Sequence, residues 1–286
     1  MEVVHGHGER FAPEPGQEAP MAEQFARLDF VCGQLDFADK KVLDCGCGTG
    51  YSLAHIASLF PIADYVGIDP DQGAIDYAVN RYPSMEYVVM NALDIKFPAA
   101  SFDIVLSFEV LEHLTKPEQA RYVSEMARVL RPGGTLVLST PNRDVFSLGY
   151  TESLNPYHLS ELTLPEMRRL LDAHFQDPTI YGQFFANVAA REKDFAQLRN
   201  AFTSWKRLKR HTVGTLRRSG IGDSLYTRYE RLKSAVRGPR TVYPFTIKKE
   251  DFGFDSDHMN VAKWFLCLCA ARAKMVLMWS AVFVGV

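Results

Sequence analysis

Short apolar runs alternate with amphipathic stretches through the middle of the chain. The apolar runs have the length and composition of buried strands, and they occupy residues 41–44, 65–68, 85–89, 104–108, 135–139 and 178–181. Between most of them, apolar residues recur at helical spacing, over residues 52–59, 72–81, 116–130 and 164–174. Strands and helices in this alternation are typical of a parallel sheet covered by helices on both faces, so we predict an α/β fold.

The same pattern divides the chain into four segments. They are an N-terminal segment with one helix (1–40), an α/β core (41–182), a basic helical insertion or lid (183–245), and a last strand with an apolar tail (246–286). The helix of the first segment is predicted over residues 21–35, and the last strand over 263–270. Pro132, Gly133 and Gly134 predict a turn that ends the fourth helix of the core before the next strand begins.

The bulk composition excludes several classes of protein. The chain has 286 residues, of which 47% are hydrophobic, enough for a large buried core. A net charge of −2 gives no global indication of a nucleic-acid or membrane surface as partner. The five cysteines are an odd number and include two C-x-C pairs, which makes a poor disulfide framework. We therefore expect a cytoplasmic protein with reduced thiols.

The ends of the chain do not have the pattern of targeting or membrane-spanning segments. Residues 1–20 lack the basic and apolar regions of a signal peptide. The uninterrupted apolar stretch at residues 275–286 is twelve residues long, whereas a spanning helix needs roughly twenty. Packing of this tail on the core is the favoured interpretation, and a peripheral membrane contact is the alternative.

The predicted insertion is strongly basic. Between Arg191 and Arg240 there are fourteen Lys and Arg residues against four acids, a local net charge of +10. Such a helical lid would attract a phosphate-bearing acceptor or anionic lipid. The alternative is a solvated face whose charged side chains cover an apolar underside. The region contains no nucleic-acid reading module, so nucleic acid is not expected as a partner.

A glycine-rich turn joins the first core strand to its helix, in the sequence VLDCGCGTGY at residues 42–51. The glycine spacing does not match the G-x-G-x-x-G of dinucleotide-binding turns. The pattern instead suits a compact ligand with an amino-acid tail, whose ammonium group Asp44 would bind and whose carboxylate would face backbone N–H groups. We take the cofactor-binding candidates here to be Asp44, Gly46, Cys47, Gly48 and Gly50. A tight structural turn is the alternative. Because Cys45 and Cys47 fall inside this motif, no metal site is predicted.

Polar residues follow the second and third core strands. Asp69 ends the second strand and precedes Pro70, where an acidic side chain can accept hydrogen bonds from both hydroxyls of a ribose. The alternative for Asp69 is an ordinary helix N-cap. Asn91, next to Ala92, follows the third strand and is the candidate for reading the exocyclic amine of an adenine, with Asp94 as second choice. The alternative for both is a solvated loop residue.

The fourth core strand ends with Ser107, Phe108 and Glu109. Ligands of open α/β sheets bind beyond the carboxyl ends of the strands, so these three residues are further cofactor-binding candidates. His113 lies four residues beyond Glu109 and is a candidate catalytic residue. A structural or surface histidine is the alternative for His113.

Four motifs together resemble the class I S-adenosylmethionine (SAM)-dependent methyltransferases. They are VLDCGCGTG, VGIDPD, SFDIVLSFEVLEHL and RVLRPGGTLVLSTPN, and the resemblance covers about residues 40–145. It implies a Rossmann-like, mostly parallel sheet of seven strands with helices on both faces, SAM as cofactor and S-adenosylhomocysteine as product. Asn91 stands where this family more often has Asp, so the adenine contact is the departure from the pattern.

The flanking motifs GERFAPE, NPYHLSEL and YGQ resemble bacterial methyltransferases associated with surface-glycan biosynthesis. This resemblance implies O-methylation of a hydroxyl on a sugar, glycan or other small-molecule acceptor. His158 is the candidate general base because an imidazole side chain suits proton transfer near neutral pH, and Glu161 would orient it. Asn155 and Tyr157 are candidate substrate-binding residues. The alternative is that Asn155, His158 and Glu161 only shape and cap the next helix.

Three other functions stay open from the sequence. A non-catalytic SAM-binding subunit would use the basic segment and the apolar tail as interaction surfaces. N- or C-methylation of a small metabolite would use the same cofactor half of the domain. A nucleotide-dependent oxidoreductase is disfavoured by the glycine spacing.

Overall fold

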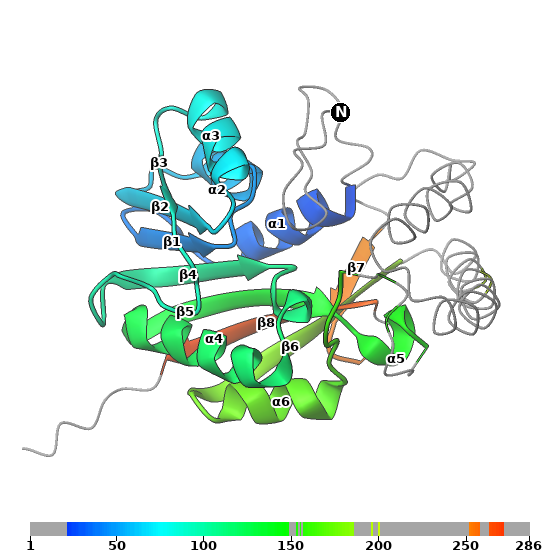
Figure 1. The fold of residues 1–286 in the computed structure, drawn as a ribbon. Coiled ribbons are helices and arrows are strands. Elements are labelled where there is room, and N and C mark those ends of the chain that lie inside the picture. Colours follow the sequence, from blue (N-terminus) through cyan, green and yellow to red (C-terminus); the bar gives the residue numbers. More distant parts are fainter. Residues whose placement is uncertain are drawn as a thin grey trace, which may run out of the picture.

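The computed structural model describes residues 22–148, 153, 155, 157–185, 196, 200, 252–257 and 263–271. These residues form one mixed sheet of eight strands in the order β3-β2-β1-β4-β5-β8-β6-β7 (Figure 1). The strands are β1 (Lys41–Cys45), β2 (Asp64–Asp69), β3 (Glu86–Val89), β4 (Phe102–Phe108), β5 (Leu130–Pro141), β6 (Phe175–Phe185), β7 (Phe252–Asp255) and β8 (Trp264–Ala271). The expected sheet of seven strands is thus extended by one further strand, β7, at its edge.

Most of the sheet is parallel, as predicted. The pairs β1–β2, β1–β4, β2–β3 and β4–β5 are parallel. Strand β8 inserts antiparallel between β5 and β6, and β7 pairs antiparallel with β6. The last predicted strand, 263–270, is therefore confirmed as β8, and its central place makes the C-terminal part of the chain integral to the sheet.

Helices cover both faces of the sheet. They are α1 (Ala22–Gln34), α2 (Tyr51–Leu59), α3 (Gln72–Arg81), α4 (Lys116–Val129), α5 (Arg143–Phe146), α6 (Leu164–Asp172) and the short 3₁₀ helix η2 (Leu111–His113). Figure 1 shows α1, α2 and α3 on one side of the sheet and α4 and α6 on the other. The helices predicted from apolar spacing are confirmed, with ends that differ by at most a few residues.

Alternation along the strands explains the two hydrophobic cores. Successive strand side chains point to opposite faces, and Val42 packs with the α1–α3 core whereas Leu43 packs with the α4–α6 core. Val105 and Leu106 on β4 divide in the same way. Strands buried on both faces read as continuous apolar runs, which is why the sequence pattern located them.

The predicted turn at Pro132–Gly134 is wrong in its position. These residues lie within β5, where the pairing with β4 shifts from Phe102–Leu130 to Ile104–Thr135. The extra residues form a bulge, and Gly133 takes the left-handed backbone that the bulge requires (φ 79°). The glycines therefore interrupt a strand that has already begun at Leu130.

Several predictions fall outside the described residues. These are the structure of the N-terminal segment up to residue 21, of nearly all of the 183–245 insertion, and of the apolar tail from residue 272. The four-segment division therefore stays a prediction. Among the described residues, no helix has both the length and the apolar character needed to cross a membrane.

Candidate functional site

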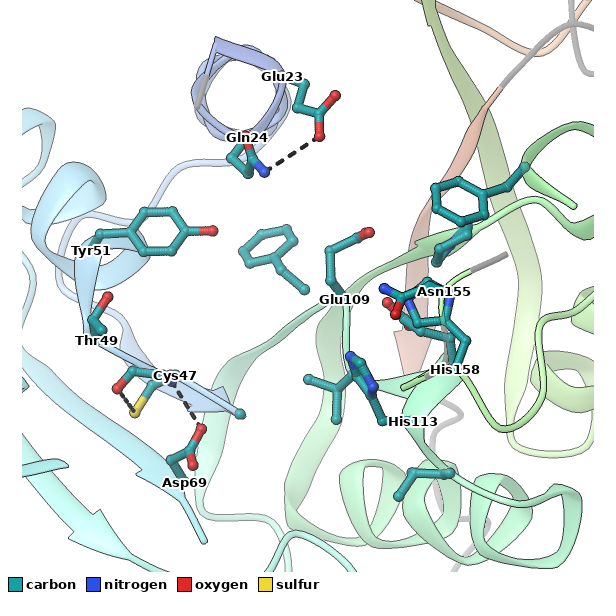
Figure 2. Close-up of a pocket in the computed structure, with 18 of the residues that line it drawn as sticks. Glu23, Gln24, Cys47, Thr49, Tyr51, Asp69, Glu109, His113, Asn155 and His158 are labelled. Carbon is teal, nitrogen blue, oxygen red and sulfur yellow. Dashed lines mark hydrogen bonds between the residues drawn. The ribbon is translucent and has the colours of Figure 1, made fainter. Parts of the chain in front are cut away.

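A cavity of about 420 Å³ opens at the carboxyl ends of β1, β2, β4 and β5, beneath the start of α1. This edge is where open α/β sheets bind ligands. The lining residues are Glu23, Gln24, Gly46, Cys47, Gly48, Thr49, Tyr51, Asp69, Pro70, Phe108, Glu109, Val110, Glu112, His113, Leu114, Pro141, Phe146, Asn155, His158 and Lys263. In Figure 2 the glycine turn and Asp69 occupy one side, His113, Asn155 and His158 the other, and Glu109 lies between them.

The glycine turn fits tightly against the structure below it. Gly46 and Gly50 both have left-handed backbone, with φ of 81° and 80°. A Cβ atom on Gly46 would lie 2.4 Å from a Val110 methyl carbon, and one on Gly50 would lie 2.6 Å from the Tyr87 hydroxyl. Larger side chains are therefore excluded here, and the backbone itself forms the cavity wall.

Asp69 is held at the cavity edge by backbone donors. The Gly48 N–H donates to its Oδ2 at 3.0 Å, and the Asp71 N–H donates to its Oδ1 at 2.9 Å. Asp69 is not the N-cap of α3. That residue is Asp71, whose side chain accepts a hydrogen bond from the Ala74 N–H at the start of α3. Asp69 thus joins the second strand to the glycine turn and presents a fixed carboxylate to the cavity.

Asp44 lies beneath the turn and does not line the cavity. Its side chain is buried and accepts a hydrogen bond from the Ser52 hydroxyl at the start of α2. Burial raises the pKa of Asp44 to about 7, and the nearby Asp69 charge adds to the increase. Asp44 therefore supports the glycine turn through its contact with the start of α2.

On the opposite side, His158 is held in place by three neighbours. Its Nδ1 lies 2.7 Å from Glu161 Oε1, and its Nε2 lies 2.9 Å from the Asn155 amide nitrogen. The Phe146 ring stacks on the imidazole with centroids 5.4 Å apart. Glu161 is buried and also accepts a hydrogen bond from the Ser147 hydroxyl at 2.6 Å. The carboxylate at Nδ1 favours the tautomer that leaves a lone pair on Nε2.

A second histidine lies against the first. The rings of His113 and His158 meet edge to face at 5.2 Å, and His113 Nδ1 lies 3.0 Å from the Tyr157 carbonyl oxygen. Candidate ligand atoms of Glu112, His113 and His158 lie within 4.8 Å of one another, and these residue types can hold a metal ion. Burial raises the pKa of Glu112 well above its ordinary value, with the Glu109 charge as the second cause.

Comparison with known proteins identifies the family. A methyltransferase domain model matches residues 43–138. A Mycolicibacterium smegmatis protein named a probable S-adenosylmethionine-dependent methyltransferase is 40% identical over 180 residues, which cover 62% of this chain and 67% of that one. The chain belongs to the S-adenosylmethionine-dependent methyltransferase family.

Two further proteins are similar to this chain, one in sequence and one in fold. A Mycobacterium tuberculosis methyltransferase, with the same probable function in its name, is 42% identical over 146 residues, 51% of this chain. This chain spans only about half (52%) of that relative. The crystal structure of the [4+2]-cyclase SpnF superposes with a TM-score of 0.54 at 19% identity, covering 95% of this chain and 89% of SpnF. That similarity supports the methyltransferase fold alone.

The cavity gathers most of the residues that the sequence nominated. Lining it are Gly46, Cys47, Gly48, Asp69, Pro70, Phe108, Glu109, His113, Asn155 and His158. Outside the lining are Asp44, Gly50, Asn91, Ala92, Ser107, Tyr157 and Glu161. Asn91 is exposed and its side chain accepts from the Leu93 N–H, whereas Ser107 is buried against the Tyr122 hydroxyl at 2.9 Å. The second-choice adenine residue, Asp94, is also exposed, beside Lys96.

Sequence reasoning missed several charged residues at the cavity, namely Glu23, Glu112 and Lys263 in its lining and Arg27 behind Glu109. Arg27 on α1 is buried and donates to Glu109 and Ser139, each at 2.9 Å. A charged residue within the apolar face of the first predicted helix was the available signal. Lys263, just before β8, lines the cavity beside Phe146. No local pattern marks Lys263, because the pairing of β8 with β5 and β6 brings it to the site.

Proposed function

We propose that this protein binds SAM in the cavity and transfers its methyl group to a hydroxyl of a sugar, glycan or other small-molecule acceptor. The proposal rests on two different sets of residues that face each other across one cavity. The glycine turn and Asp69 form the cofactor side, and His158 with Glu161 forms the acceptor side. Membership in the methyltransferase family supports the first half of the proposal.

The cofactor side fits an adenosyl amino acid. Asp69 would accept hydrogen bonds from the ribose hydroxyls, and the backbone of Gly46 to Gly48 would contact the amino-acid tail. Among the described residues, Gln24 Oε1 is a buried acceptor without a hydrogen-bond partner, and Gln24 lines this cavity. A ligand ammonium group is a donor that would satisfy it. The proposed adenine contacts are Pro70 and Asn91 with Ala92, at the ends of the neighbouring strands β2 and β3.

SAM supplies, when bound, an electrophilic methyl carbon on its sulfonium. The protein's contribution is position and proton transfer. Aligned reactants held near contact distance can gain on the order of 7 kcal/mol relative to free encounter. The acceptor hydroxyl would replace the Asn155 amide at His158 Nε2, whose lone pair would take the hydroxyl proton. Glu161 at Nδ1 would stabilise the resulting imidazolium. His113 would assist at the same wall, and Asn155 and Tyr157 would position the acceptor.

The methylated atom and the kind of acceptor are proposed on other grounds. The choice of oxygen over nitrogen or carbon, and of a glycan acceptor, rests on the flanking motifs and on the His158–Glu161 pair. The basic segment at residues 191–240 would form an acceptor lid that favours phosphate-bearing molecules. The alternative is a non-catalytic SAM-binding subunit. SpnF, a cyclase with a similar fold, illustrates that this fold alone does not specify methyl transfer.

Incubation with methyl-labelled SAM and a panel of sugars, hydroxy acids and amines tests the proposal. The expected result is a product heavier by one methyl, with the methyl on oxygen by mass spectrometry. Methylation only of amines would replace O- with N-methylation. Saturable SAM binding without transfer to any acceptor, in the panel or in a metabolite extract of the source cells, would favour the non-catalytic alternative.

A further inference from the structure

The basic side chains in the cavity lining lie on its acceptor side. They are Lys263, His113 and His158, and the buried carboxyl of Glu112 lies beside the two histidines. On the cofactor side the lining carboxylate is Asp69, with Glu23 nearby on α1. Glu109, between the two sides, is paired with Arg27. Figure 2 shows Asp69 on one side of the space and His113 and His158 on the other. The acidic side suits SAM, which carries a net positive charge through its sulfonium and ammonium groups. The other side suits a molecule of opposite charge.

Lys263 is held firmly in that wall by its backbone. Its N–H donates to the Gln183 carbonyl of β6 at 3.0 Å, and its carbonyl accepts from the Asn142 N–H at 2.9 Å. Lys263 is therefore fixed between the end of β5 and the end of β6, both at the edge of the sheet that forms the cavity. A cationic side chain on such a rigid base loses less entropy on binding a ligand than one on a loop.

The side chain of Lys263 belongs to the same surface as the proposed base. Its ammonium nitrogen lies 5.9 Å from the centroid of the Phe146 ring, and the same ring stacks on His158 at 5.4 Å. Lys263, Phe146 and His158 thus line one continuous wall. An acceptor that lies on Phe146 would reach the lysine with one group and the histidine with another.

We propose that the acceptor is an oxyanion, carrying a carboxylate or phosphate that Lys263 binds while a separate hydroxyl faces His158. This inference rests on the proposed function and adds the charge class of its substrate. A lysine ammonium forms charge-assisted hydrogen bonds with carboxylate or phosphate oxygens, and partial exclusion of water strengthens them. This proposed contact is made by Lys263, which belongs to the core, and it does not depend on the basic segment at 191–240.

The test follows label from methyl-labelled SAM into a metabolite extract of the source cells, with the products separated on an anion-exchange column. Wild-type protein is expected to place the label in the retained, anionic fraction. Phosphatase treatment of the extract distinguishes the two sources, because it abolishes the retained product of a phosphate acceptor and leaves that of a carboxylate acceptor.

Variants then test Lys263 itself. Lys263→Met keeps the aliphatic stem over Phe146 and is expected to lower kcat/KM for the purified anionic acceptor at least tenfold, with SAM affinity within twofold of wild type. Lys263→Arg should restore most of the loss. Lys41→Met is the matched control, because Lys41 also lies beside a phenylalanine ring, Phe102 at 5.6 Å, but at the opposite end of β1.

Each outcome bears on a different claim. Label in the unretained, neutral fraction, or unchanged kcat/KM in Lys263→Met, overturns the inference and leaves the proposed function intact. Absence of SAM binding, or of any transfer, contradicts the proposed function and this inference with it.

Discussion

Arg27 and Glu109 form an ion pair that fastens α1 to the carboxyl end of β4. Arg27 Nη1 lies 2.9 Å from Glu109 Oε1, and the two side chains are 3% and 29% exposed. The same Glu109 oxygen accepts from the Ser139 hydroxyl at 2.7 Å, and Arg27 Nε donates to Gln183 at 2.9 Å. One arginine therefore connects α1 with β4, β5 and β6.

This network also holds an unfavourable backbone conformation at the cavity. Glu109 has a left-handed φ of 56°, which costs a non-glycine residue on the order of 1 kcal/mol. Such a conformation persists where surrounding contacts determine it, and here the contacts are Arg27 and Ser139. The cavity wall at Glu109 is thus positioned by a residue of the helix that precedes the core.

A double-mutant cycle tests the coupling of this pair. Arg27→Met, Glu109→Gln and the double variant are compared by urea unfolding. Removal of either charge takes the ion pair away from a largely buried place, so we expect a coupling free energy of about 1–3 kcal/mol. Additivity of the two single changes within about 0.5 kcal/mol would show that the pair does not join α1 to the sheet.

His158 and Glu161 are expected to affect turnover rather than cofactor affinity. Loss of general-base catalysis costs typically ~10²-fold or more, and we expect His158→Ala to reduce kcat by at least tenfold. SAM affinity should remain within twofold, since His158 lies across the cavity from the glycine turn. His174→Ala is the control, because His174 lies between α6 and β6 and outside the cavity lining. Unchanged turnover in His158→Ala would remove it from the mechanism.

The cluster of Glu112, His113 and His158 allows a direct test of metal dependence. In the general-base mechanism the acceptor hydroxyl replaces the Asn155 amide at His158 Nε2 while Glu161 stays at Nδ1, and no metal ion takes part. The general-base account therefore predicts that treatment with EDTA, followed by gel filtration, leaves turnover within twofold. A tenfold loss that Mg²⁺ or Zn²⁺ restores would instead make these residues metal ligands.

The raised pKa of Asp44 predicts a pH-dependent stability. The Asp44 carboxyl has a pKa of about 7 in the folded protein, whereas in the unfolded chain its pKa is about 3.9. The unfolded state therefore binds fewer protons between these values. The free energy of unfolding should fall as pH rises from about 4 to 7, by up to about 1.4 kcal/mol per unit from this group, and should level off above.

Asp44→Asn isolates that contribution because the amide keeps an acceptor for Ser52 and cannot ionise. Denaturant unfolding between pH 4 and 8 should show a flatter profile for the variant, which would exceed wild type in stability at pH 8. Parallel profiles for the two proteins would indicate that Asp44 is ionised in the fold at neutral pH.

Apolar runs in the sequence predicted the part of the sheet from β1 to β5 well. Strands β1, β2, β4 and β5 have apolar runs that are largely buried on both faces, and the glycine turn and Asp69 lie next to those runs in sequence. Strand β7 escaped prediction because four residues, Phe252–Asp255, become a strand only by pairing with the end of β6. Arg27 escaped for a similar reason, since its Gln183 partner is 156 residues away.

Cofactor binding by the glycine turn and Asp69 is the central claim, and calorimetric titration with SAM and S-adenosylhomocysteine tests it most directly. The account predicts saturable one-site binding to wild type and at least tenfold weaker binding to Asp69→Asn, because the amide loses the charge that both ribose hydroxyls would contact. Asp64→Asn, at the other end of β2 beside Lys41, should bind like wild type. No heat with either ligand on well-folded protein, or equal affinity in Asp69→Asn, would contradict the claim.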